Sequence, residues 1–164
     1  MFLTIYTIIH VIISLVGILS GFVVLAGLLT ARRLDGVTAL FLATTAATSV
    51  TGFFFPFHGI TPGIVVGIIS LVVLTISAFA RYPRHLLGGW RKTYVITAVL
   101  ALYFNVFVLV VQLFEKVPAL KNLAPTQTEP PFKITQLLVL ILFIVLGALA
   151  AIRFRAESAP VASK

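Results

Sequence analysis

The first 31 residues of the chain carry no Asp, Glu, Lys or Arg, and most of them are Ile, Leu, Val or Phe. An uncharged apolar run of about 18 or more residues is long enough to cross the hydrocarbon core of a membrane as an α-helix. Further runs follow along the 164-residue chain, which is 60% hydrophobic and only 10% charged. Because backbone groups surrounded by lipid must pair within the span, the sequence predicts an all-α integral membrane bundle.

We predict five transmembrane helices in one domain, residues 1–155, followed by a short cytoplasmic tail at residues 156–164. The long connection at residues 115–133 contains four prolines, which are expected to keep it from forming regular structure. The expected helices cover residues of about 2–30, 37–57, 63–80, 94–114 and 134–152.

The basic residues predict the orientation of the bundle, because Lys and Arg accumulate on the cytoplasmic side of a membrane. Nine cations fall in alternate connections and the tail, whereas the other connections hold only Lys116, Lys121 and Lys133. The N-terminus is therefore expected outside and the C-terminus inside. The net charge of +8 then indicates membrane lipids as partners and not nucleic acid. The expected interface anchors are Arg32, Arg33, Arg81, Arg84, Trp90, Arg91, Lys92, Arg153 and Arg155.

Polar side chains inside the apolar spans are candidates for function, because each one costs free energy unless it is paired. At a rise of about 1.5 Å per residue, His10, His58, Gln112 and Gln136 lie about 26–33 Å above the inner charges. Asn105 lies deeper, on nearly the same helix face as Gln112, and Glu115 follows one turn later. We therefore predict a polar ligand-binding pocket near the outer face, formed by His10, His58, Asn105, Gln112, Glu115 and Gln136.

Several ligands suit this set of side chains. Two histidines at one height on different helices could ligate a b-type haem, and His10, His58 and Glu115 could hold a zinc ion. A quinone or a lipid head group could bind Gln112, Asn105 and His10. Ordinary hydrogen bonds between helices would also account for these polar residues, without any cofactor. Our main expectation is therefore that the protein holds no cofactor or metal.

Enzymatic motifs are missing from the sequence. The chain has no cysteine, no nucleotide-binding glycine motif, no zinc-protease motif and no pair of carboxylates within a span. We therefore expect a non-enzymatic membrane protein that is an accessory subunit of a larger complex or a binder of a small apolar ligand. The alternatives are an electron-transfer protein linked to b-type haem or quinone and, third, a small transporter that acts as a homo-oligomer.

Several short segments of the sequence carry a resemblance. They are Leu34-Asp35-Gly36, the run from Thr51 to Gly59 (TGFFFPFHG), Ala124-Pro125-Thr126-Gln127 and Glu129-Pro130-Pro131-Phe132. With these segments the chain resembles, over nearly its whole length, a group of small, functionally unassigned polytopic inner-membrane proteins of proteobacteria. The resemblance implies only a bacterial inner-membrane location. Combined with the orientation predicted from the basic residues, this location places the N-terminus in the periplasm and the C-terminus in the cytoplasm. The resemblance assigns no functional residue.

Overall fold

The computed structural model describes residues 2–56 and 62–154, and every regular element within them is a helix. The all-α prediction is therefore confirmed for this part of the chain. The helices are α1 (Phe2–Leu29), α2 (Asp35–Gly52), α3 (Pro62–Arg81), α4 (Trp90–Lys116), α5 (Pro118–Leu123) and α6 (Pro130–Arg153).

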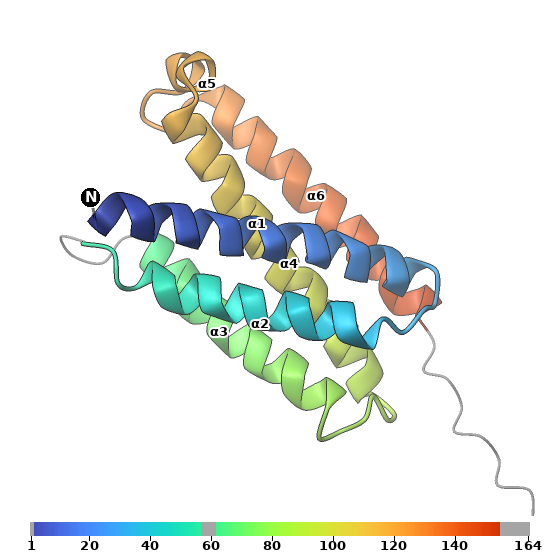
Figure 1. Ribbon diagram of the computed structural model, residues 1–164. Helices are drawn as coiled ribbons and strands as arrows, with labels where there is room; N and C mark the ends of the chain where they lie inside the picture. The colour runs from blue at the N-terminus through green and yellow to red at the C-terminus, as the bar shows by residue number, and fades with distance from the viewer. Residues whose placement is uncertain (1, 57–61, 155–164) are drawn as a thin grey trace, which may run out of the picture.

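The long helices run back and forth through one bundle (Figure 1). Helices α1 and α2 lie side by side, and α4 crosses them obliquely while packing against α3 and α6. The end of α1, the start of α2, the end of α3, the start of α4 and the end of α6 share one end of the bundle, which we call the basic end. The short helix α5 lies at the opposite end.

Among the described residues, four helices are long and apolar enough to cross a membrane: α1, α4, α6 and residues Gly63–Arg81 of α3. Helix α6 shows most clearly that the surroundings are apolar, because only Phe143 and Ala150 are buried along its 24 residues. Most of its other large aliphatic side chains, including Leu138 and Ile144, are exposed. Contiguous apolar surface of this extent is typical of a face that contacts lipid or another protein.

The boundaries of α2 and α4 differ from the predicted ones. Helix α2 begins at Asp35, not at residue 37, and ends at Gly52 because Phe53 and Phe54 form turns. The remainder of the predicted second helix includes Phe57, which lies outside the described residues. Helix α4 begins four residues early, so that Trp90, Arg91 and Lys92 form its first turn.

The predicted structureless connection at residues 115–133 was wrong. Helix α4 continues to Lys116, α5 occupies Pro118–Leu123, and α6 begins at Pro130. The physical reason is the position of the prolines. A proline in the first turn of a helix loses no intrahelical hydrogen bond and already has a helical φ angle, so it starts a helix as readily as it interrupts one.

Close packing on one face of α4 depends on glycines of α1. A Cβ atom on Gly21 would lie 2.6 Å from Leu102 Cδ1 and 2.9 Å from Phe41 Cε2, so only glycine lets α1 approach α4 and α2 this closely. A Cβ atom on Gly17 would lie 3.3 Å from the hydroxyls of both Thr44 and Thr45. The pair Gly17 and Gly21 therefore forms a helix-contact face of the kind that membrane bundles use.

Candidate functional site

His10 is tied to the end of α2. Its Nδ1 atom lies 2.7 Å from Thr51 Oγ1, and its ring packs edge-on against Phe55 at 5.1 Å between centroids. One turn earlier, the Tyr6 hydroxyl donates a hydrogen bond of 2.6 Å to the Thr51 carbonyl. His58, the second candidate haem ligand, lies outside the described residues. Within the described ranges, no three His, Asp or Glu side chains come together.

Asn105 faces the interior of the bundle, as its depth predicts. Its Nδ2 atom donates a hydrogen bond of 3.0 Å to Thr45 Oγ1, and Thr45 is fully buried on α2. A Cβ atom on Gly17 would lie 3.6 Å from the same nitrogen. Asn105 therefore joins α4 to α2 at the point where the glycine face of α1 passes.

The other predicted residues separate from this contact. Gln136 donates a hydrogen bond of 3.2 Å to the Phe107 carbonyl, which links α6 to α4, and its Oε1 atom is buried without a partner. Gln112 is exposed, and the exposed Glu115 pairs with Lys116 at 3.3 Å. The face of α4 that reaches α2 at Asn105 is therefore exposed two turns later at Gln112. No hydrogen bond joins any two of the five predicted residues that are described, and a shared site including His58 stays a prediction.

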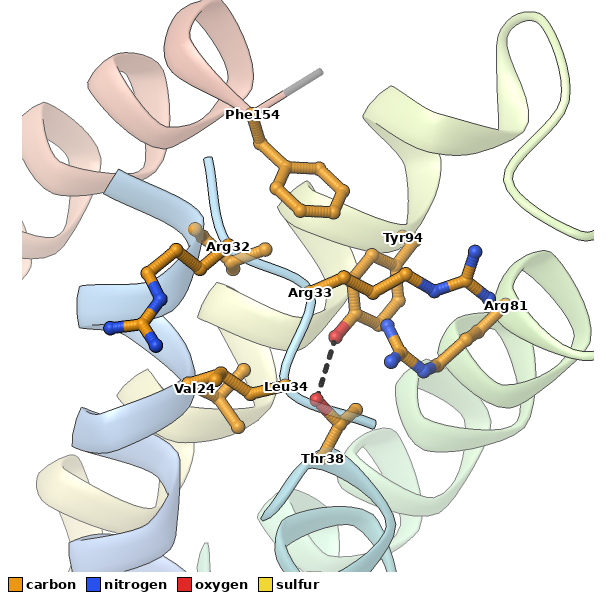
Figure 2. A pocket seen from close by; sticks show the side chains of 9 residues that line it. Val24, Arg32, Arg33, Leu34, Thr38, Arg81, Tyr94 and Phe154 are labelled. Carbon is orange, nitrogen blue, oxygen red and sulfur yellow. Dashed lines mark hydrogen bonds between the residues drawn. The ribbon is translucent and has the colours of Figure 1, made fainter. Parts of the chain in front are cut away.

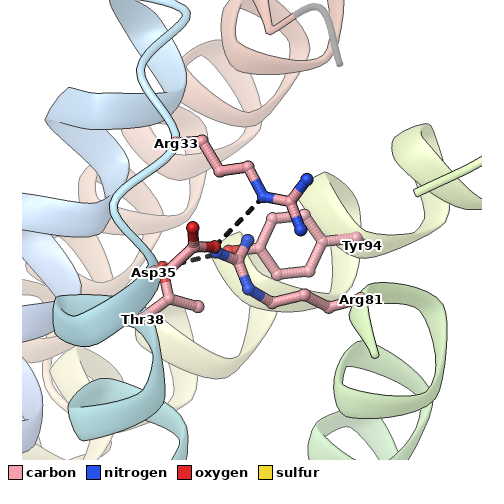
Figure 3. Close-up of polar contacts among 5 residues, drawn as sticks. All are labelled: Arg33, Asp35, Thr38, Arg81 and Tyr94. Atoms are coloured by element: carbon pink, nitrogen blue, oxygen red, sulfur yellow. Dashed lines mark hydrogen bonds and ion pairs between the residues drawn. The ribbon is translucent and has the colours of Figure 1, made fainter. Parts of the chain in front are cut away.

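The sequence did not predict an ion pair at the basic end in which the arginine is buried. Arg81 was expected at the membrane surface, but its side chain is only 2% exposed and its guanidinium donates to Asp35 Oδ1. Arg33 donates to the same oxygen at 3.1 Å, so two arginines share one carboxylate atom (Figure 3). The Asp35 side chain is 69% exposed. Arg81 therefore contributes to the core and is not a lipid-facing anchor.

The ion pair has favourable surroundings on three helices. Asp35 occupies the first turn of α2 and Arg81 the last turn of α3, where the helix dipoles stabilise a negative and a positive charge respectively. The Arg81 guanidinium also lies over the Tyr94 ring at 5.0 Å from its centroid, and the Tyr94 hydroxyl is 3.5 Å from Thr38 Oγ1. The contact thus ties together α2, α3 and α4.

Figure 2 shows a crevice that Arg81 lines together with Arg32, Arg33 and Tyr94. The guanidinium groups of Arg32 and Arg33 point in different directions from its rim, and Phe154 and Tyr94 form its walls. The side chains that line this crevice fill it, so that it has no room for a water-sized molecule. We conclude that the basic end is a structural contact and not a cavity for a ligand.

The remaining predicted anchors lie where a membrane interface is expected. Arg84 stacks over both Trp90 and Phe79, and Arg91 donates a hydrogen bond of 3.4 Å to the Ala151 carbonyl near the end of α6. Exposed side chains at this end are Arg32, Arg33, Arg84, Lys92 and Arg153, whereas Arg155 lies outside the described residues.

An apolar groove runs between α4 and α6 on the side of the bundle. It has a volume of about 300 Å³ and is open along its length. The α6 wall combines the bulky Leu140, Phe143 and Ile144 with three small residues, Gly147, Ala148 and Ala151. The other wall is formed by α4, whose lining residues are Ile96, Val99, Leu100 and Tyr103.

Tyr103 brings a polar group to this apolar groove. Its ring lies 5.7 Å from the rings of both Phe104 and Phe143 and 6.2 Å from that of Phe107. Its hydroxyl makes no hydrogen bond within residues 2–56 and 62–154. Two signals in the sequence could have indicated this site: a hydroxyl in the middle of a span, and a stripe of small residues on the last helix.

Comparison of the chain with family models, curated proteins and solved structures found no match. The features of the chain that bear on function are the groove between α4 and α6, the Asp35–Arg81 ion pair and the separate polar contacts of His10, Asn105 and Gln136.

Proposed function

We propose that the chain is a non-enzymatic multi-pass membrane protein that binds a small apolar ligand in the groove between α4 and α6. The observation that carries the proposal is the groove itself, whose volume of about 300 Å³ equals the lower end of the usual range for ligand pockets. Its lining is apolar except for Tyr103. A single phenol offers no acid–base pair for catalysis, which favours binding without chemistry.

The proposed topology has five spans, with α2 as the fifth. With 18 residues, α2 is about 27 Å long, close to the thickness of a hydrocarbon core of about 30 Å. Helix α2 also runs between the two ends of the bundle, alongside α1 (Figure 1). The proposed orientation places the basic end in the cytoplasm and the N-terminus in the periplasm of a bacterial inner membrane.

Two properties of the groove favour ligand binding over plain contact with lipid. Its α6 wall has no bulky side chain at Gly147, Ala148 or Ala151, although the neighbouring exposed positions on α6 are mostly Leu, Ile and Val. Its opening faces the side of the bundle, so a ligand dissolved in the membrane reaches it without crossing water. The groove therefore offers unfilled space beside an apolar face.

The test is photolabelling of the protein in nanodiscs with a palmitic acid that carries a mid-chain diazirine. Labelled peptides should concentrate on residues 96–103 and 140–151 in the native chain. Ala148→Leu fills the groove and should reduce this labelling about ten-fold, if overpacking costs about 1–3 kcal/mol. The matched control is Ala43→Leu, which makes the same change at an exposed position on α2 away from the groove.

The outcomes separate a binding groove from ordinary lipid contact. A bilayer that simply wets the protein would label the exposed faces of α1, α3 and α6 to the same extent as the groove. Even labelling of this kind, or equal labelling of the Ala148→Leu and Ala43→Leu proteins, would contradict the proposal.

A further inference from the structure

Tyr103 lies in the middle of α4, which is one of the helices long and apolar enough to cross a membrane. Tyr103 is the central residue of α4, because Trp90 lies thirteen positions before it and Lys116 thirteen positions after it. At about 1.5 Å per residue it is about 20 Å from both ends of the helix. A hydroxyl at this depth has no water to bond and costs free energy while it is unpaired.

Neighbouring aromatic rings hold this hydroxyl at the edge of the groove. Phe104 and Phe107 on its own helix and Phe143 on α6 all contact the Tyr103 ring. Phe143 is buried, so the side of the ring that faces α6 is packed. Tyr103 and Phe143 both line the groove, which places a donor without an acceptor beside unfilled space.

The nearby Asn105 shows that the fold can satisfy a polar group at the same depth. Two positions along α4, the Asn105 amide donates to Thr45 Oγ1. Tyr103 has no such partner among the described residues, although the groove next to it is open. An acceptor supplied by a ligand in the groove would complete the pairing.

The depth of Tyr103 restricts the chemistry of that acceptor. Phospholipid head groups and their ester carbonyls lie at the edges of a hydrocarbon core of about 30 Å, so they are about 15 Å from its middle. A charged ligand would be strongly disfavoured at this depth. The acceptor must therefore belong to an uncharged molecule that dissolves in the hydrocarbon core.

We propose that the groove binds an apolar ring molecule of the quinone class, with Tyr103 donating a hydrogen bond to one of its carbonyl oxygens. The proposal rests on the proposed function of the groove and names the ligand class for it. The flat ring lies against Gly147, Ala148 and Ala151, where the α6 wall has no bulky side chain, and an apolar tail extends along the groove toward lipid. Binding requires no oxidation or reduction.

The experiment compares two probes by native mass spectrometry of the purified protein in detergent. One is decylubiquinone, which has ring carbonyls, and the other is the same decyl-substituted ring with methoxy groups in place of both carbonyls. A methoxy oxygen is a weaker acceptor, so the native protein should bind decylubiquinone about five- to ten-fold more tightly, as for one hydrogen bond in an apolar site. Tyr103→Phe should abolish this preference while leaving the affinity for the methoxy probe unchanged.

Ala148→Leu separates the failure of this inference from the failure of the groove. If Ala148→Leu weakens both probes but Tyr103→Phe changes neither, the groove binds ligands and the carbonyl assignment is wrong. If Ala148→Leu changes neither probe, the proposed function itself is wrong. If the native protein binds neither probe and Ala148→Leu converts a dimer into a monomer, the groove is occupied by a second copy of the chain, and both proposals are overturned.

Discussion

The two sides of α4 are built differently although both lie in the same apolar surroundings. On one side, α4 packs against α1 and α3, with a glycine contact at Gly21, and the polar Asn105 reaches Thr45 of α2 through a hydrogen bond. We call this the closed side. On the other side, which we call the open side, there is a groove of about 300 Å³ between α4 and α6. The Tyr103 hydroxyl at this groove has no hydrogen-bond partner among the described residues.

The contrast indicates that the closed side stabilises the bundle, whereas the open side is the proposed site of ligand binding. Lipid tails are as apolar as leucine, so helices associate only where packing is close or polar groups pair. The closed side meets both conditions. On the open side, specific contacts lie toward the ends of α6, where Gln136 bonds the Phe107 carbonyl and Arg91 bonds the Ala151 carbonyl. Between these contacts α6 can accommodate a ligand.

The largest expected effect is that of a leucine placed in the glycine contact of the closed side. In Gly21→Leu the new side chain would overlap Leu102 and Phe41, so we expect a loss of about 3 kcal/mol in the free energy of unfolding, the upper end for overpacking. SDS titration followed by circular dichroism measures it.

The matched change on the open side is Gly147→Leu. A Cβ atom on Gly147 would lie 3.3 Å from Val99 Cγ1, and the rest of the side chain would enter the groove. We expect a loss of less than about 1 kcal/mol, because the groove absorbs the added volume. Equal losses at Gly21 and Gly147 would remove the distinction between the two sides.

The second-largest effect on the free energy of unfolding is expected from the Asp35–Arg81 ion pair, which joins α2 to α3 at the basic end. Asp35→Ala leaves the buried Arg81 without its carboxylate. Removing one partner of a fully buried pair costs about 3–5 kcal/mol, and the exposure of Asp35 reduces our expectation to about 2 kcal/mol. The same SDS titration checks it.

A double variant distinguishes charge from packing at this position. Asp35→Ala lowers the free energy of unfolding mainly because it leaves the buried charge of Arg81 unpaired. Adding Arg81→Leu removes that charge, so the double variant should recover at least half of the lost stability. Arg33→Ala should have little effect, since the Arg33 side chain is 39% exposed and Arg81 retains the carboxylate. Additive losses in the double variant would show that Arg81 acts through packing instead.

The sequence predicted the helical class and the ends of α1 and α3 within about two residues, because uncharged apolar runs and their flanking charges determine where a chain can cross lipid. It also indicated that Asn105 faces inward. It did not predict that Asn105 and Gln112 have different surroundings. Two residues on the same helix face share an environment only where a neighbouring helix runs along the whole of that face. The oblique crossing of α4 over α2 is a property of the packed bundle and is invisible in residue spacing.

The Asp35–Arg81 pair was missed for a related reason. A positively charged residue at the end of a span is ordinarily an interface anchor, so the rule that predicts orientation gives every such residue the same role. Burial of Arg81 depends on the α2–α3–α4 contact, and no local feature of RYPRH distinguishes Arg81 from Arg84. The prolines of residues 115–133 misled in the same way, since a proline starts or stops a helix according to its position relative to the neighbouring helical residues.

The third effect tests the polar pairing on the closed side. Asn105→Leu removes the donor that reaches Thr45 on α2, and a lost hydrogen bond of this kind costs about 0.5–1.5 kcal/mol. The matched control is Gln112→Leu, the same amide type on the same helix but at an exposed position. Its effect should be within about 0.5 kcal/mol of zero. A larger loss of stability for Gln112→Leu than for Asn105→Leu would show that Gln112, and not Asn105, faces the interior of the bundle.

The smallest expected effect concerns how α6 is held on the open side, and it is a dependence on pH. Glu129 precedes α6 and accepts hydrogen bonds from the Thr126 hydroxyl and from the backbone N–H groups of Thr126 and Thr128. Slight desolvation raises the pKa of Glu129, but these hydrogen bonds outweigh it and hold the pKa below its usual value of 4.5. The charged form is therefore the one that the folded loop stabilises.

The sign of the pH dependence follows from this lowered pKa. The contribution of Glu129 is fully present above the unfolded pKa, near 4.5, and is lost as the pH falls through the lower folded value. Because α6 has few buried residues, loosening its first turn should be visible locally: amide exchange in residues 126–134, corrected for intrinsic rates, should rise at pH 3 relative to pH 6. In Glu129→Gln the faster exchange should already be present at pH 6. Exchange near the Asn105–Thr45 contact should not change, because the closed side holds without the loop, and a simultaneous rise there would mean that the two sides of α4 unfold as one unit.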